Sequence, residues 1–303
     1  MHITRTALTA GTAVALAAVA LVACSDSRTP ASPVDPSPVQ ERAVSTPATS
    51  AAVRANRAPG AFRRIPESYR WVGEEHNRLL DIALNQLASA RTHDRAEYER
   101  MKKDCGWAFA SVRDNLDEAA RRGGFASRRN EAVRSGREGV ARMPRCSAMA
   151  SSMALFAPAA VVASAPVARQ DGGDMQEETL AALSSMVTEV AAANSPADID
   201  AAIARASATA SRLPAGQSDV LFAAASLTAG SAAYWETVGD GTHSMSLFAA
   251  QDDSWSGFKS VVTADAAGCA SFLATVGRLP LPWQVKIAGC LITGAVSSVF
   301  AVF

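Results

Sequence analysis

Apolar residues recur at every third or fourth position over most of the chain beyond residue 60, and this spacing is typical of amphipathic α-helices. Runs that favour strands, such as Val161-Val162 and Val261-Val262, are too short to predict a sheet. The pattern therefore predicts an all-α body, built as a helical bundle. The predicted helices start with one that opens at Pro66 and carries an apolar stripe to Leu87, followed by residues 94–122, 127–142, 148–163, 177–193, 195–213, 218–238, 260–277 and 285–303.

Local signals mark several of these boundaries. Ser195 comes directly before Pro196, which predicts an N-cap followed by proline at the first helical position. Gly123-Gly124 is expected to stop the helix that precedes it. Pro158 is expected to kink the apolar helix 148–163.

The last two predicted helices carry almost no charge, with Asp265 and Lys286 as the exceptions within them. Small residues repeat at every fourth position, as at Ala266, Ala270 and Ala274. Such a repeat lets two helix backbones come close together. The C-terminal region is therefore expected to form a small-residue-rich helical hairpin.

Two interpretations of this hairpin remain open. We favour a hairpin that supplies the core of the bundle, because Asp265 and the proline-rich bend at 277–282 suit a packed hairpin better than a membrane-spanning one. The alternative is a membrane-active protein that inserts residues 261–303 into a bilayer, in the manner of pore-forming or bacteriocin-like hairpins. The last helix is at the lower limit of spanning length.

The N-terminus has the form of an export signal. A short polar start with one positive charge at Arg5 precedes an uncharged apolar run over 7–20, which is too short for a stable membrane span. The run ends in Leu21-Val22-Ala23-Cys24. This segment resembles the lipobox of bacterial lipoproteins; an ordinary secretory signal peptide is the alternative.

The lipoprotein resemblance implies that residues 1–23 are removed and that Cys24 becomes an acylated N-terminus. Two or three acyl chains hold a protein firmly on a bilayer, whereas one holds it weakly. The resemblance also implies an exported protein that is lipid-anchored to the cell envelope. In a bacterium with two membranes, Ser25 after the cysteine implies transfer to the outer membrane.

Residues 24–59 are rich in proline, serine, threonine and alanine. Such a segment lacks the large apolar side chains needed to offset the entropy of folding, so we interpret it as a disordered tether. The remaining residues, 60–303, suffice for one helical domain.

The net charge of the chain is zero, but the charges are divided between a basic half, 60–145, and an acidic and apolar half, 146–303. From Arg54 to Arg145 there are 20 Lys and Arg against 13 Asp and Glu, and beyond that point 6 against 13. The basic half is expected to lie against the acidic half of its own chain. Anionic lipid headgroups or an envelope protein are alternative partners. Nucleic acid is not expected as a partner, because the implied exported location removes it and no alternation of aromatic and basic residues is present.

Apart from Cys24 the chain has four cysteines, an even number that suits disulfides in an oxidising compartment. We predict the pairs that are local in sequence, Cys105 with Cys146 and Cys269 with Cys290. The second pair is expected to lie about two turns from the bend on either side of the hairpin. No CxxC or paired-histidine spacing is present, so neither a metal site nor a cofactor is predicted.

A second and looser resemblance concerns about a quarter of the chain. The residues that carry it are Gly73-Glu74-Glu75-His76-Asn77, Tyr234-Trp235, Trp255 and Ala264-Asp265-Ala266-Ala267-Gly268. Together they resemble a group of uncharacterised exported bacterial proteins with an early His-Asn helix and a small-residue-rich C-terminal helix. This resemblance implies no known activity.

These residues also suggest a polar cluster. Glu75 or Asp265 would form an acid–base pair with His76 if the fold brought them together. We favour a structural role, in which His76 and Asn77 hold the first helix to the last.

Asp265 would then accept a buried hydrogen bond or pair with a cation such as Arg78 or Lys259. No catalytic motif is present, and no catalytic residue is predicted. The sequence therefore predicts a non-enzymatic structural or interaction module.

Overall fold

The computed structural model describes residues 62–143, 175–239, 255–277 and 279–302, together with Gly60 and Cys146. These residues contain no strand, so the predicted all-α class is confirmed for them. Their helices are η1 (Phe62–Arg64), α2 (Glu67–His93), α3 (Arg95–Met101), α4 (Cys105–Asp114), α5 (Asp117–Arg122), η2 (Ala126–Arg128), α6 (Arg129–Arg142), α9 (Glu177–Ala192), α10 (Pro196–Ala210), α11 (Gln217–Gly239), α12 (Trp255–Val276) and α13 (Trp283–Ala301). The predicted signal peptide, Cys24, the predicted tether and the predicted helix 148–163 lie outside the described residues.

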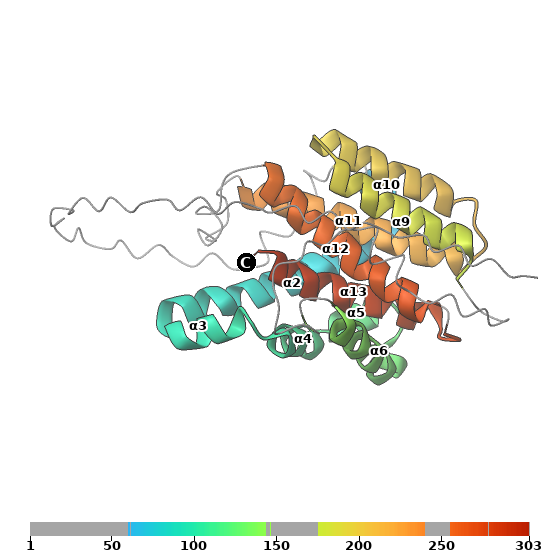
Figure 1. Cartoon of the computed structure of the whole chain (residues 1–303). Coiled ribbons are helices and arrows are strands. Elements are labelled where there is room, and N and C mark those ends of the chain that lie inside the picture. The colour runs from blue at the N-terminus through green and yellow to red at the C-terminus, as the bar shows by residue number, and fades with distance from the viewer. Residues whose placement is uncertain are drawn as a thin grey trace, which may run out of the picture. The chain divides into compact units, whose positions relative to one another are not determined.

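The helices pack in layers within the unit that runs from Thr46 to Phe303. In Figure 1, α9 and α10 lie at the top, α11, α12 and α13 follow beneath them, and α4 to α6 lie at the bottom. The central helix α13 contacts α12, α6, α2, α4 and α11. The basic and acidic halves of the sequence therefore pack against each other, as expected.

Ion pairs contribute little to this packing of the two halves. Arginines of the basic half pair with carboxylates of the same half, as Arg100 does with Glu97 and Arg121 does with Glu118. Contacts between the halves are instead mostly apolar, and they include the burial of Val72, Leu79 and Leu80 of α2 in the common core. The charge asymmetry of the sequence thus does not explain how the halves are held together.

The prediction of a single helix over 94–122 is wrong, because the structure divides this segment into α3, α4 and α5. Aspartates cap the first two of these helices. The Asp94 side chain accepts a hydrogen bond from the backbone N–H of Glu97 (3.0 Å), and Asp104 accepts one from that of Trp107 (3.1 Å). Each carboxylate satisfies a free donor at a helix start, so the chain turns between helices that share one apolar stripe.

Other predicted boundaries are confirmed. Ser195 caps α10, with its hydroxyl accepting from the backbone N–H of Asp198 (3.3 Å) and Pro196 in the first helical position. Gly123 follows the last residue of α5. The two C-terminal helices form the predicted hairpin, with the bend between Val276 and Trp283.

The burial of α13 fits the interpretation in which the hairpin supplies the core. By length and composition this helix is apolar enough to cross a membrane, but 89% of its most apolar window is buried inside the protein. The small residues of the hairpin make this close packing possible. A Cβ on Gly289 would lie 1.9 Å from the ring of Phe272, so only glycine leaves room for that ring. In this structure α13 is the centre of the core.

The structure joins Cys105 to Cys146 and Cys269 to Cys290, the pairs that the spacing predicted. Cys105 and Cys146 tie α4 to the segment after α6, and Cys105 keeps 9% of its surface exposed. Cys269 and Cys290 tie α12 to α13 and are fully buried, with 0% exposure each.

This difference in burial predicts ordered reduction. Because thiol–disulfide exchange requires access to a sulfur atom, mild reductant added to the native protein should open Cys105–Cys146 well before Cys269–Cys290. Trapping with an alkylating reagent and peptide mass spectrometry would show the order. Simultaneous reduction of both bridges in native protein would contradict the predicted order.

Replacing both Cys269 and Cys290 by alanine should lower the free energy of unfolding by about 3 kcal/mol, the chain-entropy value for a loop of this size.

Candidate functional site

A series of polar contacts joins α2 to α11 at the centre of the protein. The pairs are Gly73 with Ser226, Asn77 with Gly230 and Asp81 with Tyr234, each separated by 153 positions. Both members of a pair advance by four residues at each step, so the two helices run in the same direction and meet once per turn. We call this series the α2–α11 ladder.

The contacts of the ladder are made by different groups. The backbone N–H of Gly73 donates to the Ser226 hydroxyl (3.2 Å), and the Asn77 amide donates to the carbonyl of Gly230 (3.0 Å). The Tyr234 hydroxyl donates to Asp81 (2.9 Å). The ladder therefore uses the backbone of each helix as well as side chains, which requires a short distance between the two helix axes.

At the start of α2, the Tyr69 hydroxyl donates to Asp219 of α11. Burial is the main cause that raises the pKa of the Tyr69 phenol above its ordinary value, and the hydrogen bond and the negative charge of Asp219 raise it further. The phenol therefore remains a hydrogen-bond donor throughout the neutral range.

Two glycines set the distance between these helices. A Cβ on Gly230 would lie 2.6 Å from the Cα of Gly73, and one on Gly73 would lie 2.5 Å from the carbonyl oxygen of Ser226. Both contacts are with backbone atoms, which cannot move aside as the end of a side chain can. Larger residues at either position would therefore separate α2 from α11.

His76 lies beside the ladder with 0% of its surface exposed. Its Nδ1 is 3.2 Å from the side-chain oxygen of Asn77. Because the Asn77 nitrogen donates to Gly230, this oxygen is an acceptor, and Nδ1 of His76 carries a proton. The other ring nitrogen, Nε2, points to Asp265 on α12, with 3.5 Å between Nε2 and Oδ2.

Asp265 is also completely buried. Its Oδ2 accepts a hydrogen bond from the Ser231 hydroxyl of α11, and its Oδ1 has no hydrogen-bond partner among the described residues. An isolated carboxylate is costly to bury, and the groups that face this one are the Ser231 hydroxyl and the His76 ring.

Glu75 does not join this pair. Its two carboxylate oxygens accept from Arg78 (2.7 Å) and from Arg122 of α5 (3.0 Å), on the other side of α2. Partial burial opposes the charge on Arg122, but its hydrogen bonds with Glu74 and Glu75 outweigh that effect and raise the pKa of the guanidinium. The prediction that Glu75 belongs to one cluster with His76 is therefore wrong.

The expected cationic partner of Asp265 is also different. Arg78 donates to Glu75 and to the carbonyl of Asn115 (2.6 Å), and the partners of Asp265 are Ser231 and His76. Lys259 lies on a half-buried position of α12 and forms no ion pair with Asp265 among the described contacts. The alternative of a buried hydrogen bond is the one that the structure contains.

The serine, histidine and aspartate of this cluster are not arranged for nucleophilic catalysis. In a hydrolytic triad the histidine lies between serine and carboxylate and takes the proton of the hydroxyl. Here the Ser231 hydroxyl donates to the carboxylate instead, and all three side chains are 0% exposed. The cluster joins α2, α11 and α12, and its geometry suits a structural contact.

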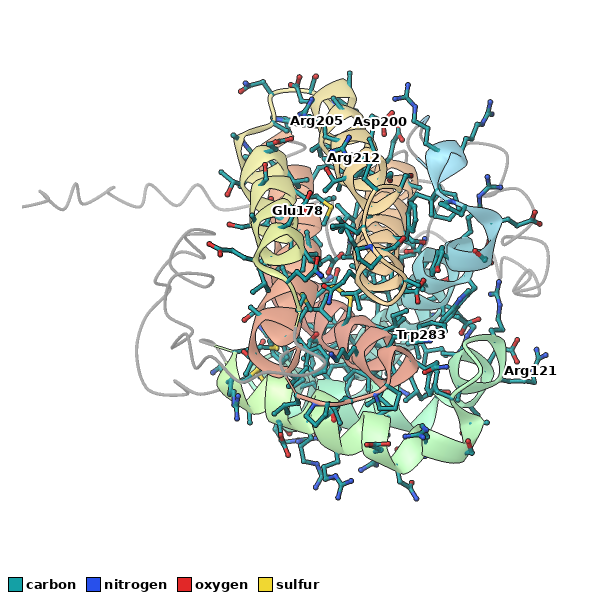
Figure 2. All side chains as sticks on the ribbon, turned by 90° about the vertical axis from the view of Figure 1, so that its right-hand side faces the viewer. Arg121, Glu178, Asp200, Arg205, Arg212 and Trp283 are labelled. Carbon is teal, nitrogen blue, oxygen red and sulfur yellow. A yellow bond between two sulfur atoms is a disulfide. The ribbon has the colours of Figure 1, made fainter. Side chains whose placement is uncertain are left out.

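Other candidate sites in the described residues are simpler. No three His, Cys, Asp or Glu side chains come close enough there to hold a metal ion. A shallow groove of about 530 Å³ runs between α9 and α10, and Figure 2 shows Glu178, Arg205 and Arg212 along it. Alanines of both helices line part of it, and Arg205 is paired with Glu189 (2.6 Å). The groove offers mixed charge and no convergent polar groups.

Comparisons with protein-family models, with curated proteins and with solved structures found no match for this chain. The two resemblances drawn from the sequence therefore remain predictions.

The glycine contact can be tested directly. Gly230→Ala should lower the free energy of unfolding by about 2–3 kcal/mol, because the added methyl group meets the backbone of α2. Gly106→Ala is the control on the exposed side of α4, where the added methyl group would lie 3.0 Å from a side-chain oxygen of Asp104 and not from backbone, and it should change stability by less than about 1 kcal/mol. Urea unfolding would measure both. Equal stabilities for the two variants would refute the proposed role of Gly230.

A double-mutant cycle can test the buried pair. His76→Gln and Asp265→Asn should each cost about 3 kcal/mol, because each leaves a buried polar partner behind. The double variant should lose less than the sum, with a coupling energy of at least about 1 kcal/mol. The exposed pair Glu189–Arg205 is the control, and its coupling should stay below about 1 kcal/mol. Additive effects at His76 and Asp265 would mean that the two side chains do not interact.

Proposed function

We propose that this protein is a lipid-anchored component of the bacterial cell envelope, and that its helical body is a non-enzymatic structural or interaction module. The observation that carries the proposal is the lipobox Leu21-Val22-Ala23-Cys24, followed by a proline-rich tether over 24–59. An acylated Cys24 would hold the body on a membrane without any spanning helix. In a bacterium with two membranes, Ser25 supports the outer membrane as its location.

The cysteine bridges support an exported location. Disulfides persist in oxidising compartments and are rare in the cytosol of most organisms. Two bridges tie the body at positions separated by 41 and 21 residues. Such bridges stabilise a folded protein mainly by restricting its unfolded state.

The buried polar cluster supports a structural rather than catalytic body. Ser231, His76 and Asp265 are enclosed by helices and have no exposed surface. A substrate would reach them only if α2, α11 and α12 separated, and the α2–α11 ladder opposes that separation.

Anchoring by lipid alone is favoured over insertion of the C-terminal hairpin. Inserting α13 would remove it from α2, α4 and α6 as well as from α11, and would expose their apolar faces to water. About 25 cal/mol is lost for each Å² of apolar surface that becomes exposed. The disulfide between α12 and α13 would be retained during insertion, but the contacts with the other helices would not.

The anchor is tested by the chemistry of the mature N-terminus. Mass spectrometry of the protein from its native membrane should find a peptide that begins at a diacylglyceryl-modified Cys24. Cys24→Ala should abolish incorporation of labelled fatty acid. A Cys24→Ser variant that is exported behind an ordinary secretory leader should be found in the soluble fraction and not on the membrane. An unmodified Cys24 would disprove the anchor. If the Cys24→Ser variant without acyl groups stayed on the membrane, insertion of the hairpin would be favoured.

A further inference from the structure

The bend between α12 and α13 exposes apolar side chains in an otherwise well-covered protein. Leu279 and Trp283 are the large hydrophobic residues that remain exposed among the described positions, at 45% and 37%. They lie four residues apart in Leu279-Pro280-Leu281-Pro282-Trp283, which we call the hairpin tip. In Figure 1 the tip lies at the right-hand end of α12 and α13, and Figure 2 labels Trp283 on the side that faces the viewer.

The tip has a fixed conformation. The backbone N–H of Leu279 donates to the carbonyl of Val276 (2.9 Å), and the buried ammonium group of Lys286 donates to the carbonyl of Gly277 (2.6 Å). The two prolines restrict the backbone between these contacts. A surface that is already ordered loses little entropy on binding, so the exposed apolar groups are held ready for a partner.

The side chains at the tip suit a lipid interface. Trp combines a large apolar ring with a polar N–H and is enriched at the boundary between lipid and water. The sequence from Ala266 to Phe303 contains no acidic residue, so the tip itself carries no charge that phosphate headgroups would repel. Glu177 and Glu178 begin α9 close to the bend, since the N–H of Met175 donates to the carbonyl of Gly277 (3.3 Å). Binding would therefore be driven by apolar surface rather than by net charge.

We propose that the hairpin tip is a second membrane contact, at which Leu279 and Trp283 enter the interfacial layer of the bilayer that holds the acyl groups. This inference rests on the proposed lipid anchor. In the sequence, 36 residues (24–59) separate the proposed anchor from the body. The body thus stays within reach of the bilayer, and a contact too weak to hold a free protein becomes effective through high local concentration. The tip orients the body, whereas the anchor retains it.

Vesicle binding by a chain without acyl groups tests the tip independently of the anchor. The chain from residue 24 onward, with Cys24→Ser, is mixed with vesicles of phosphatidylcholine and phosphatidylglycerol in a 3:1 ratio, and flotation measures its partition coefficient. The parent should bind weakly, and high salt should change the binding less than twofold. Leu279→Ser with Trp283→Ser should lower the partition coefficient about tenfold. Ala181→Ser with Ala208→Ser, at exposed positions of α9 and α10, is the matched control and should bind as the parent does.

Tryptophan quenching locates the contact even if the double serine variant unfolds. Lipids brominated on the acyl chains should quench fluorescence of the parent, and Trp283→Phe should remove most of that quenching while the protein still floats. No binding by the parent, or equal binding by the parent and a folded tip variant, would overturn the inference. So would photo-crosslinking from position 283 in cells that captures a protein instead of lipid. These results would leave the acylation of Cys24 untouched, because the tested chain carries no acyl group.

Discussion

The backbone contact between Gly73 and Gly230 determines how the rest of the body is arranged. Because neither residue has a Cβ, α2 and α11 approach closely enough for the Asn77 amide to reach the carbonyl of Gly230. The same approach directs His76 toward α12. A shift of one residue between the helices would break every contact of the ladder at once, since these contacts recur at every fourth position. The glycine pair therefore fixes the register as well as the distance.

The His76–Asp265 pair completes this arrangement at a cost. Burying two ionisable groups rarely adds stability compared with apolar residues of the same size, and 3.5 Å between Nε2 and Oδ2 is longer than a good hydrogen bond. We interpret its contribution as specificity for one packing arrangement. An apolar helix such as α12 could pack in several rotations about its axis, because most of its faces are equally apolar. A single buried carboxylate that must meet Ser231 and His76 selects one of them.

Periodicity predicted the helices well, and it predicted their breaks poorly. The stripe over 94–122 continues through three helices because the aspartate caps change the direction of the chain without changing the spacing of apolar residues. His76 and Asp265 could be found because each is a polar residue in an apolar setting. Ser231 and Gly230 were missed because α11 is apolar on nearly all sides and small residues are common along it. The four-residue repeat of Ser226, Gly230 and Tyr234 was the available signal, but it has meaning only beside the matching repeat in α2.

The apolar character of α13 and the exposure of the hairpin tip follow from the same construction. A helix surrounded on all sides by α2, α4, α6, α11 and α12 must be apolar all round, and hydropathy alone cannot distinguish it from a membrane span. Its first residue, Trp283, lies beyond the cover of those neighbours and remains partly exposed. Unpacking α13 would expose the faces of five helices, whereas placing the tip at a lipid surface exposes none. Membrane contact through the tip is thus compatible with an intact core, and contact through the whole hairpin is not.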